Sequence, residues 1–478
     1  MANRQRRKRR YNIKRIIGVI AVELLVIVLL IAGYKFVRAK FDPIKPNDNI
    51  EENNNGLDNN NQGDNNNIDE KLSPEELEAR NEQERLRKEN EERQNLIDQA
   101  DLLTLSYDYD GAIDLIKSYQ GPEGGYELYP VLREAIERYE TEKSSLVHLG
   151  GSYNSVTEVN HIFFHSLIAD NSKAFDGDYD SVGYNMYMTT IYEFIKMMEK
   201  MYEDGYVLVS IHDLVKLVTL EDGSTKFVEG EILLPPGKKP FVISQDDVNY
   251  YQYMEGDGFA SRMVLDENGK VTCEMILDDG SVVTGPYDMV PILDDFVEKH
   301  PDFSYKGAKG IIALTGYEGS LGYRTNDPTS PTYEQDKETV KKVAEAMKAN
   351  GWEFASHTWG HRDMSKSTFS FVKTDMTKWM EQVGSLVGPT DIIIFPYGID
   401  IETTMGHYES DKYHFLKELG FNYFCGVYSK PWMHIKNDYV RMTRRPLDGQ
   451  AMLQFPERLA DLFNVNEVID PERPARNW

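Results

Sequence analysis

Short apolar runs and amphipathic segments alternate along the chain from residue 160 to residue 427. The apolar runs have the length and β-branched content of buried strands, and the segments between them have helical periodicity. Repeated strand–helix units predict a parallel sheet, because parallel neighbours need a crossover connection. This many units favour a closed or nearly closed α/β barrel over about residues 146–455, with its chemistry at the C-terminal strand ends.

The expected strands are 161–165, 206–210, 240–244, 310–315, 353–356, 392–395 and 423–426, and the expected helices are 188–203, 211–217, 333–349, 370–386 and 412–419. Three further apolar segments, separated by Asn268-Gly269 and Asp279-Gly280, predict a β-hairpin or meander inserted at about residues 259–285.

The first forty residues have the pattern of a membrane anchor. A basic tail at residues 1–15 precedes an apolar stretch, residues 16–34, that is interrupted only by Glu23. A stretch of about nineteen residues is long enough to cross a bilayer as one helix. The positive-inside rule then places the tail in the cytoplasm and the rest of the chain outside the cell. A cleaved signal peptide is the alternative, but the stretch is long and no Ala-x-Ala site follows it.

The region between this stretch and the barrel is expected to be a spacer. Residues 35–72 are rich in Asn and Asp and predict a flexible linker. Ser73-Pro74-Glu75-Glu76 has the pattern of a capped helix start, so residues 73–145 are expected to form a helical stalk and a helix pair. Residues 456–478 are expected to be a C-terminal tail.

Charge and cysteine content narrow the classes of partner. The formal net charge is −26. Residues 1–40 hold eleven Lys or Arg against one Glu, so the remainder carries about −36. Nucleic acid is a poor partner for such a negatively charged surface. A cationic polymer, or a polymer that a reaction makes cationic, fits it better. Two cysteines, Cys273 and Cys425, do not make a disulfide framework, and whether they pair is open.

Three motifs each follow a predicted strand: Asp246-Asp247, the run from His357 to His361, and Pro396-Tyr397-Gly398. Two histidines four residues apart would share one face of a helical turn and reach a single ion. The Asp pair would add one carboxylate ligand and leave the other free as a base. Their shared placement at strand ends predicts one site for a divalent metal.

With these motifs the chain resembles the polysaccharide deacetylases of the NodB-homology family (carbohydrate esterase family 4) over about residues 146–453. The family motifs are Thr-Phe-Asp-Asp, His-Ser/Thr-x-x-His and a segment ending in Pro-Tyr-Gly. The matching residues are Ser244-Gln245-Asp246-Asp247, His357-Thr358-x-x-His361 and Pro396-Tyr397-Gly398. The early His-containing strand, 161–165, and Gly205-Tyr206 resemble the branch that deacetylates exported poly-N-acetylglucosamine.

The resemblance implies a distorted (β/α) barrel and a set of roles. Asp246 becomes the general base, and Asp247, His357 and His361 become the metal ligands. Pro396-Tyr397-Gly398 becomes part of the substrate site. The resemblance also implies removal of acetyl groups from a polysaccharide or peptidoglycan outside the cell. Zinc is the default ion for such a ligand set, and cobalt, nickel or iron also suit it.

Two departures from the family pattern keep alternatives open. The family has an Arg that contacts the base where this chain has Ile394. The family's last motif, Leu-x-His, supplies the acid, but the segment 440–449 contains no His; His165 and His434 are the nearby candidates. Because amide hydrolysis needs a protonated leaving amine, an O-acetyl esterase and an inactive glycan-binding protein are the alternatives. A zinc peptidase is disfavoured because no His-Glu-x-x-His occurs.

Overall fold

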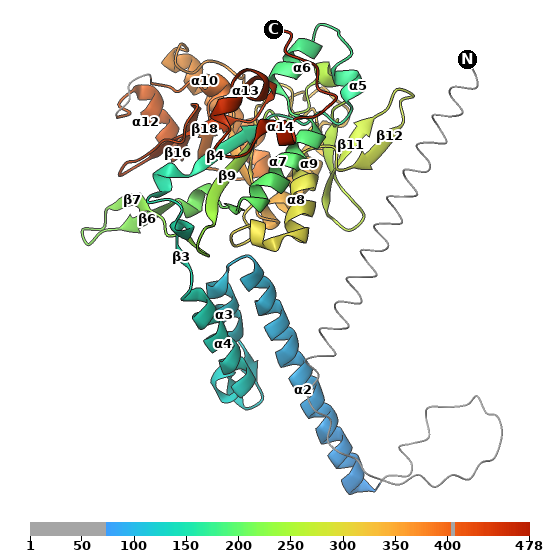
Figure 1. Cartoon of the computed structure of the whole chain (residues 1–478), viewed down its shortest axis with the longest axis vertical. Helices are drawn as coiled ribbons and strands as arrows, with labels where there is room; N and C mark the ends of the chain where they lie inside the picture. Colours follow the sequence, from blue (N-terminus) through green and yellow to red (C-terminus); the bar gives the residue numbers. More distant parts are fainter. Residues whose placement is uncertain (1–72, 403–406) are drawn as a thin grey trace, which may run out of the picture. The chain divides into compact units, whose positions relative to one another are not determined.

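Seven parallel strands close into a barrel in the computed structural model, which describes residues 73–402 and 407–478 (Figure 1). The order around the barrel is β13-β14-β15-β16-β18-β4-β9, and β9 returns to β13. The predicted α/β barrel is therefore confirmed. Its strands are β4 (Asn160–Phe164), β9 (Lys239–Asp246), β13 (Ile311–Leu314), β14 (Glu353–Ser356), β15 (Ile392–Ile394), β16 (Tyr423–Val427) and β18 (Val440–Pro446).

The ladders of the barrel differ in length. The first part of β9, Lys239–Phe241, pairs with an eighth parallel strand, β5 (Tyr206–Leu208). The last part of β9, Ser244–Asp246, pairs with β13. The ladder between β14 and β15 has a single register pair, Ser356 with Ile393.

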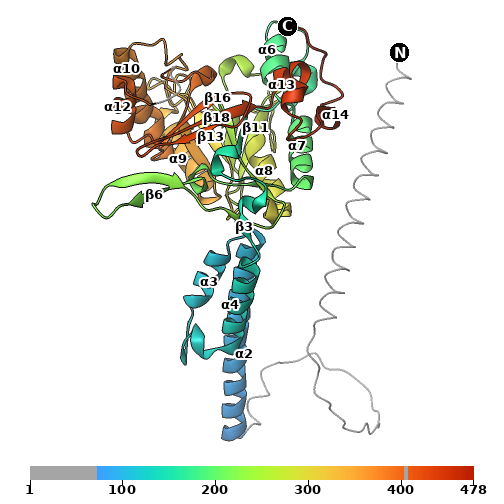
Figure 2. The same cartoon turned by 60° about the vertical axis from the view of Figure 1, so that its left-hand side comes forward.

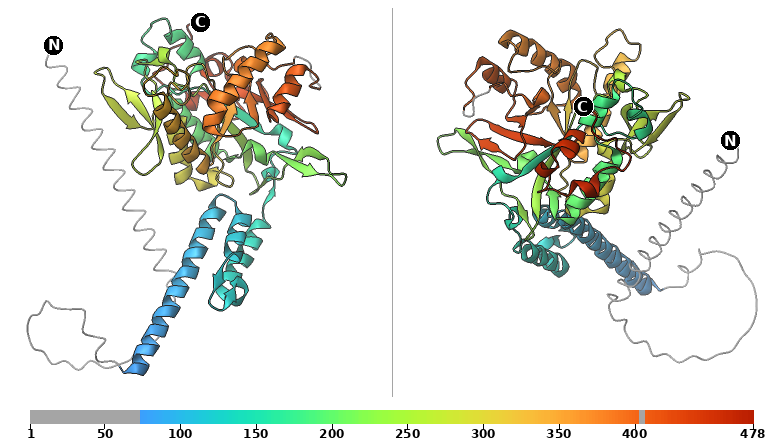
Figure 3. Two further views of the ribbon diagram at one scale, coloured as in Figure 1. Left: turned by 180° about the vertical axis from the view of Figure 1, so that it is seen from behind. Right: turned by 45° about the horizontal axis from the view of Figure 1, so that its top comes forward.

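Side-chain alternation along each strand separates two apolar cores. On β9, Val242 packs with the interior residues, while Phe241 and Ile243 pack against the surrounding helices. The helices that contribute buried residues to this outer core are α7 (Ile191–Glu203), α8 (Met289–Lys299), α9 (Tyr333–Ala349), α10 (Phe369–Trp379) and α12 (Asp411–Glu418). Figure 3 shows helices on the outside of the barrel from two further directions.

The shorter elements connect the barrel units. They are α5 (Asn171–Ala174), α6 (Ser181–Tyr187), α11 (Ser385–Val387), α13 (Gly449–Gln454), α14 (Val465–Val468) and the strands β3 (Val147–His148), β8 (Leu233–Leu234) and β17 (Met433–Ile435). The predicted helix 370–386 continues from α10 through a π-helical turn, Met380–Gly384, into α11. The expected C-terminal tail contributes Leu459, Leu462, Phe463, Val465 and Val468 to the outer core.

The predicted insert is a three-stranded antiparallel meander of β10 (Arg262–Leu265), β11 (Val271–Ile276) and β12 (Val282–Gly285). The predicted helix 211–217 is wrong. Only a 3-10 turn, Ile211–Asp213, forms there, and β6 (Val215–Thr219) then pairs with β7 (Thr225–Glu229). Val and Thr in β6 and the Asp222-Gly223 turn favour a hairpin over a short helix. This hairpin projects as a ribbon (Figure 2).

The segment before the barrel contains three helices in the described residues. The helix α2 (Pro74–Leu105) begins at Ser73, whose hydroxyl accepts from the Glu76 N–H at 3.3 Å while Glu76 accepts from the Ser73 N–H at 2.8 Å. The helices α3 (Tyr109–Lys117) and α4 (Pro130–Lys143) follow, joined through the two-residue strands β1 (Gln120–Gly121) and β2 (Gly124–Gly125). These helices and their connections share a small core of their own, with the buried residues Ile97, Ala100, Ala112, Ile113, Ile116, Tyr119, Tyr129, Leu132, Ala135, Ile136 and Tyr139.

The predicted basic tail 1–15, membrane helix 16–34 and linker 35–72 lie outside the described residues. Within the described ranges, no helix is long and apolar enough to span a bilayer. The open question about Cys273 and Cys425 is answered, since both are buried free thiols.

A histidine near the start of two barrel strands links them through two carboxylates. His212 lies 2.9 Å from Glu353 through Nδ1 and 2.9 Å from Asp391 through Nε2. Burial lowers the pKa of His212, but the hydrogen bonds to these carboxylates outweigh burial and raise the pKa to about 10. The charged imidazole therefore stabilises the folded state at neutral pH.

We expect this contribution to be complete below the unfolded-state pKa of about 6.5 and to disappear as the pH rises through about 10. Thermal unfolding of the wild type between pH 6 and 10 should show a falling midpoint, and His212→Gln should flatten that slope. His414→Gln, at an exposed position on α12, is the matched control. Parallel pH profiles for the wild type and His212→Gln would contradict the expectation.

Candidate active site

Asp246 and Asp247 reach one site because the backbone turns between them. Asp246 ends β9 and shares the inward face of the strand with Ser244. Continued extension would point Asp247 outward, but Asp247 has φ 59°, a left-handed conformation that Asp tolerates better than most residues. As a result the Asp247 carboxylate lies 3.6 Å from Nε2 of His361. Both carboxylates therefore belong to the same end of the barrel.

The two predicted histidine ligands also come together, but the expected helical turn between them is wrong. The segment from His357 to His361 is an irregular loop after β14, with φ 61° at Thr358 and φ 50° at His361. The ring centroids of the two histidines are 4.9 Å apart. The loop thus brings the two imidazoles close together, as the spacing of a helical turn would have done.

A buried carboxylate on α10 holds this loop in shape. Asp375 accepts hydrogen bonds from the backbone N–H groups of Trp359 at 2.7 Å and Gly360 at 2.9 Å. The Trp359 carbonyl in turn accepts from the Gly316 N–H at 2.9 Å. These bonds satisfy backbone groups that a helix would have paired internally.

The donor atoms of Asp247, His357 and His361 lie within 4.8 Å of one another and are individually oriented. Nδ1 of His357 donates to the Ile394 carbonyl at 2.7 Å, which leaves Nε2 with its lone pair. Tyr251 donates to one carboxylate oxygen of Asp247 at 2.6 Å, which leaves the second oxygen to face an ion. Burial lowers the pKa of His361, although Asp247 opposes this shift, so the neutral ligand form is favoured. The three residues fit a divalent ion.

Asp246 is held by an arginine that the sequence motifs did not predict. Arg444 on β18 donates to both carboxylate oxygens, at 2.7 and 2.9 Å, and both side chains are buried. Burial raises the pKa of Asp246, but the Arg444 charge outweighs it and holds the pKa well below its usual range. The contact that Ile394 cannot make is therefore made from another strand.

Of the two candidate acids, the structure places His165 near the site. His165 directly follows β4 with the inward parity of His161, and it lies close enough to Asp246, His361 and Asp448 to influence their pKa values. Nδ1 of His165 lies 3.2 Å from the Tyr187 carbonyl, which can only accept, so the bond requires the proton on Nδ1. Nε2 is then the atom that can exchange a proton with a substrate.

The other candidate, His434, lies on β17 opposite Arg441 in the antiparallel ladder to β18. Its ring packs against Trp432 with the centroids 4.2 Å apart. The residues whose charges act on it are Lys436, Arg441 and His407, none of which belongs to the site above. His434 is therefore not placed to act on the same substrate as Asp246.

One family model matches the segment that carries the two histidines. Residues 326–423 match the family model for polysaccharide deacetylase, a segment that contains both histidines and the Pro-Tyr-Gly motif. Within these residues the chain is similar to polysaccharide deacetylases. A comparison with curated protein sequences returned no match. Among solved structures, the chain is similar to the Streptococcus pyogenes deacetylase PplD in complex with acetate, at 13% identity and a TM-score of 0.34, covering 64% of this chain and 97% of that chain.

Of the three predicted substrate-binding residues, only Tyr397 exposes its side chain. Tyr397 is 64% exposed, and its ring lies edge-on to His361 with the centroids 4.6 Å apart. Pro396 is buried. Gly398 packs so tightly that an added Cβ would lie 2.3 Å from Cβ of Val427. The motif's proline and glycine shape the turn, and its tyrosine faces outward.

A cavity of about 550 Å³ lies beside His361, one of the candidate metal ligands. It is lined by Tyr317, Trp359, His361, Arg362, Lys378 and Tyr397, among others. Its aromatic members offer flat faces of the kind that pack on sugar rings. Tyr250, which follows the Asp pair closely in the sequence, is buried and donates to Asp288 at 2.6 Å. The cavity therefore places aromatic side chains next to the cluster of Asp247, His357 and His361.

Proposed function

We propose that the protein is a metal-dependent carbohydrate N-deacetylase that hydrolyses acetamide groups on a cell-wall or exported polysaccharide. The observation that carries the proposal is the convergence of a buried, ionised carboxylate, Asp246, with three oriented donors and His165 at one barrel end. An acid, a base and an ion site within one mouth are what amide hydrolysis requires. The polysaccharide deacetylase match supports the glycan as substrate.

We further propose that Asp247, His357 and His361 hold a divalent ion, with zinc as the first candidate and cobalt, nickel or iron as the others. When bound, such an ion supplies Lewis-acid chemistry, which lowers the pKa of water and polarises a carbonyl. An ion held by only three protein ligands would have coordination positions free for a water molecule and for a substrate carbonyl oxygen.

The remaining work falls to the protein's own residues. Asp246 takes a proton from the attacking water, whose oxygen forms the new bond to the acetyl carbon. His165, as the imidazolium, gives its Nε2 proton to the nitrogen as the carbon–nitrogen bond breaks and keeps its Nδ1 proton, so acetate and a free amine leave. Arg444 keeps Asp246 ionised, and the aromatic side chains Trp359 and Tyr397 orient the sugar.

The location of His165 favours an amide substrate over the alternatives. An ester expels an alkoxide of lower pKa than an amine anion, so it needs less help from an acid. An inactive glycan-binding protein would have no use for a base kept ionised by a buried Arg444. The anchor predicted at residues 16–34 supports a location at the cell membrane, with the N-terminus in the cytoplasm and the catalytic domain outside. There the enzyme meets acetylated polysaccharide or peptidoglycan, and no nucleic acid.

The test is acetate release by the purified, metal-loaded protein from N-acetylglucosamine oligomers and from peptidoglycan. We expect His165→Ala to lower kcat on these amides by about 10²–10⁴-fold, because the leaving amine loses its proton donor. An activated aryl acetate, whose leaving group needs no proton, should be hydrolysed at nearly the wild-type rate.

His434→Ala is the matched control, since this histidine lies outside the site and should leave both activities unchanged. Equal losses on amide and aryl ester in His165→Ala would remove His165 from the role of acid. A wild-type protein that releases acetate only from O-acetylated glycans would establish the esterase alternative.

A further inference from the structure

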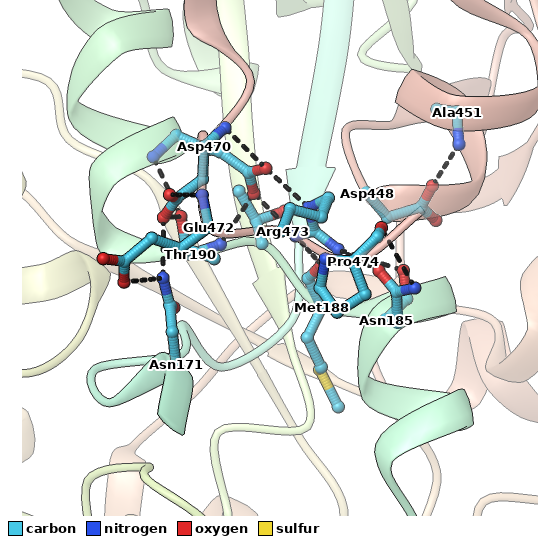
Figure 4. A network of polar contacts seen from close by, with 12 residues as sticks. Asn171, Asn185, Met188, Thr190, Asp448, Ala451, Asp470, Glu472, Arg473 and Pro474 are labelled. Atoms are coloured by element: carbon cyan, nitrogen blue, oxygen red, sulfur yellow. Dashed lines mark hydrogen bonds and ion pairs between the residues drawn. The ribbon is translucent and has the colours of Figure 1, made fainter. Parts of the chain in front are cut away.

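Asp470 and Arg473, near the C-terminal end, are buried and belong to a network of polar contacts (Figure 4). The side chain of Arg473 is fully buried and uses all five of its N–H groups. Two pair with Glu193, at 2.5 and 2.6 Å, and the others donate to Asn185 and to the Met188 carbonyl at 2.9–3.0 Å. A guanidinium bonded on every side in this way fixes the position of each partner.

The partners of Arg473 belong to the segment that orients His165. Asn185 and Met188 flank Tyr187, and the Tyr187 carbonyl is the group that lies 3.2 Å from Nδ1 of His165. Glu193 adds a second attachment, because it closes the capping box of α7 with Thr190 and holds the start of that helix. Arg473 therefore fastens the chain on both sides of the carbonyl that selects the His165 tautomer.

The same guanidinium also packs against the loop that carries Asp448. An added Cβ at Gly449 would lie 1.9 Å from the Asn185 carbonyl oxygen and 2.7 Å from Nη1 of Arg473, so backbone and guanidinium are in close contact there. Asp448 is buried, and its carboxylate accepts from the Ala451 N–H at 2.7 Å. Burial raises the pKa of Asp448 to about 6, and the nearby His165 and Arg473 oppose this shift.

The rest of the tail is anchored around these contacts. Asp470 accepts from the Thr190 hydroxyl at 2.8 Å and from the Asn171 amide at 2.9 Å. The side-chain amide of Asn185 donates to the carbonyl of Ala475 at 3.3 Å and to the side-chain oxygen of Asn477 at 3.2 Å. The tail is thus held by side chains from the α5, α6 and α7 region rather than by apolar contact alone.

From these contacts we propose that Arg473 is a positioning residue. Through it the C-terminal segment fixes the orientation of His165 and the position of the neighbouring Asp448. Arg473 touches no reacting atom. It acts through the Tyr187 carbonyl on one side and through the Asp448-Gly449 backbone on the other. The proposal rests on the proposed function of His165 as the acid, and it assigns to residues 470–478 a part in that function.

The first test compares leaving groups. We expect Arg473→Met to lower kcat for N-acetylglucosamine oligomers by about 10–100-fold, part of what a lost acid costs, with KM changed less than about twofold. Hydrolysis of an activated aryl acetate by the same protein should stay within about twofold of the wild type. A merely structural role would lower both activities in parallel, and that result would overturn the proposal.

Arg476→Met, in the same tail, is the matched control and should behave as the wild type. Because Arg473→Met leaves Glu193 buried without its counter-charge, the double variant Glu193→Gln/Arg473→Gln is tested beside it. The double variant removes both charges, so it keeps the test open if the single variant does not fold. Thermal unfolding of each variant reports the folded fraction under assay conditions.

The second test needs no turnover. Nitrogen-15 histidine NMR of the metal-free protein, with His165→Gln to assign the signal, reports which ring nitrogen carries the proton. We expect the Nδ1–H form in the wild type and a mixture of forms in the Arg473 variants. An unchanged tautomer in a folded variant would overturn the proposal. A wild type that releases no acetate would defeat the proposed function instead, while the tautomer result still decides whether Arg473 positions His165.

Discussion

Asp246→Asn is expected to lower the rate of acetate release by about 10²–10⁴-fold, because the amide cannot take a proton from the attacking water. The ion should remain bound, since Asp247, His357 and His361 are unchanged. The measurement is acetate release from N-acetylglucosamine oligomers, with the metal content of each preparation determined in parallel. Activity of the variant equal to that of the metal-loaded wild type would defeat the enzyme reading.

The same substitution is expected to destabilise the fold. Asp246 is the carboxylate partner of Arg444, and breaking a buried ion pair by removing one partner costs about 3–5 kcal/mol. Activity must therefore be compared at a temperature where both proteins are folded. Asp294→Asn is a matched control, because Asp294 is also buried but lies outside the site, where it accepts from Nε1 of Trp352 at 2.9 Å.

His357→Ala is expected to lose the ion and, with it, all acetate release above background. His357 is one of three donors, and two remaining donors leave an open site that binds a divalent ion far more weakly. The wild type should hold one ion per chain when measured by elemental analysis, and the variant close to none. A strong chelator should produce the same loss of activity in the wild type.

His434→Ala is the control for this experiment, because it removes an imidazole from the neighbouring hairpin without touching the site. Added zinc or cobalt should restore the chelated wild type but not His357→Ala. Full metal content in His357→Ala would show that the ion is held elsewhere and would remove the proposed ligand set.

Much of the barrel was predictable because strand parity is a local property. Inward and outward residues alternate on β9, and α9 spans the residues that its periodicity indicates. The segment 211–217 was misassigned because one apolar run fits either a short helix or a strand, and the hairpin partner that decides between them is not local. The turn between His357 and His361 was misassigned for a similar reason. Its shape depends on Asp375, which approaches from a later helix.

The candidate site was predictable where chemistry is carried by a motif and hidden where it depends on the closure of the barrel. Residue type and spacing are enough to predict Asp247, His357 and His361 as candidate ligands. Arg444 has no motif, and its one signal is a charged residue on the face of β18 that also carries Val440 and Met442. His165 was a candidate from its strand alone, but nothing in the sequence distinguishes it from His434.

The ladder of the barrel with the fewest paired residues, between β14 and β15, lies next to His357, a proposed metal ligand. β14 and β15 share one register pair, and the next bond across that gap is the one from Nδ1 of His357 to the Ile394 carbonyl. One imidazole therefore offers its Nε2 to an ion and its Nδ1 to the wall of the barrel. An ion that fixes this ring also strengthens the connection between β14 and β15. Binding of the ion should therefore make this end of the barrel more rigid.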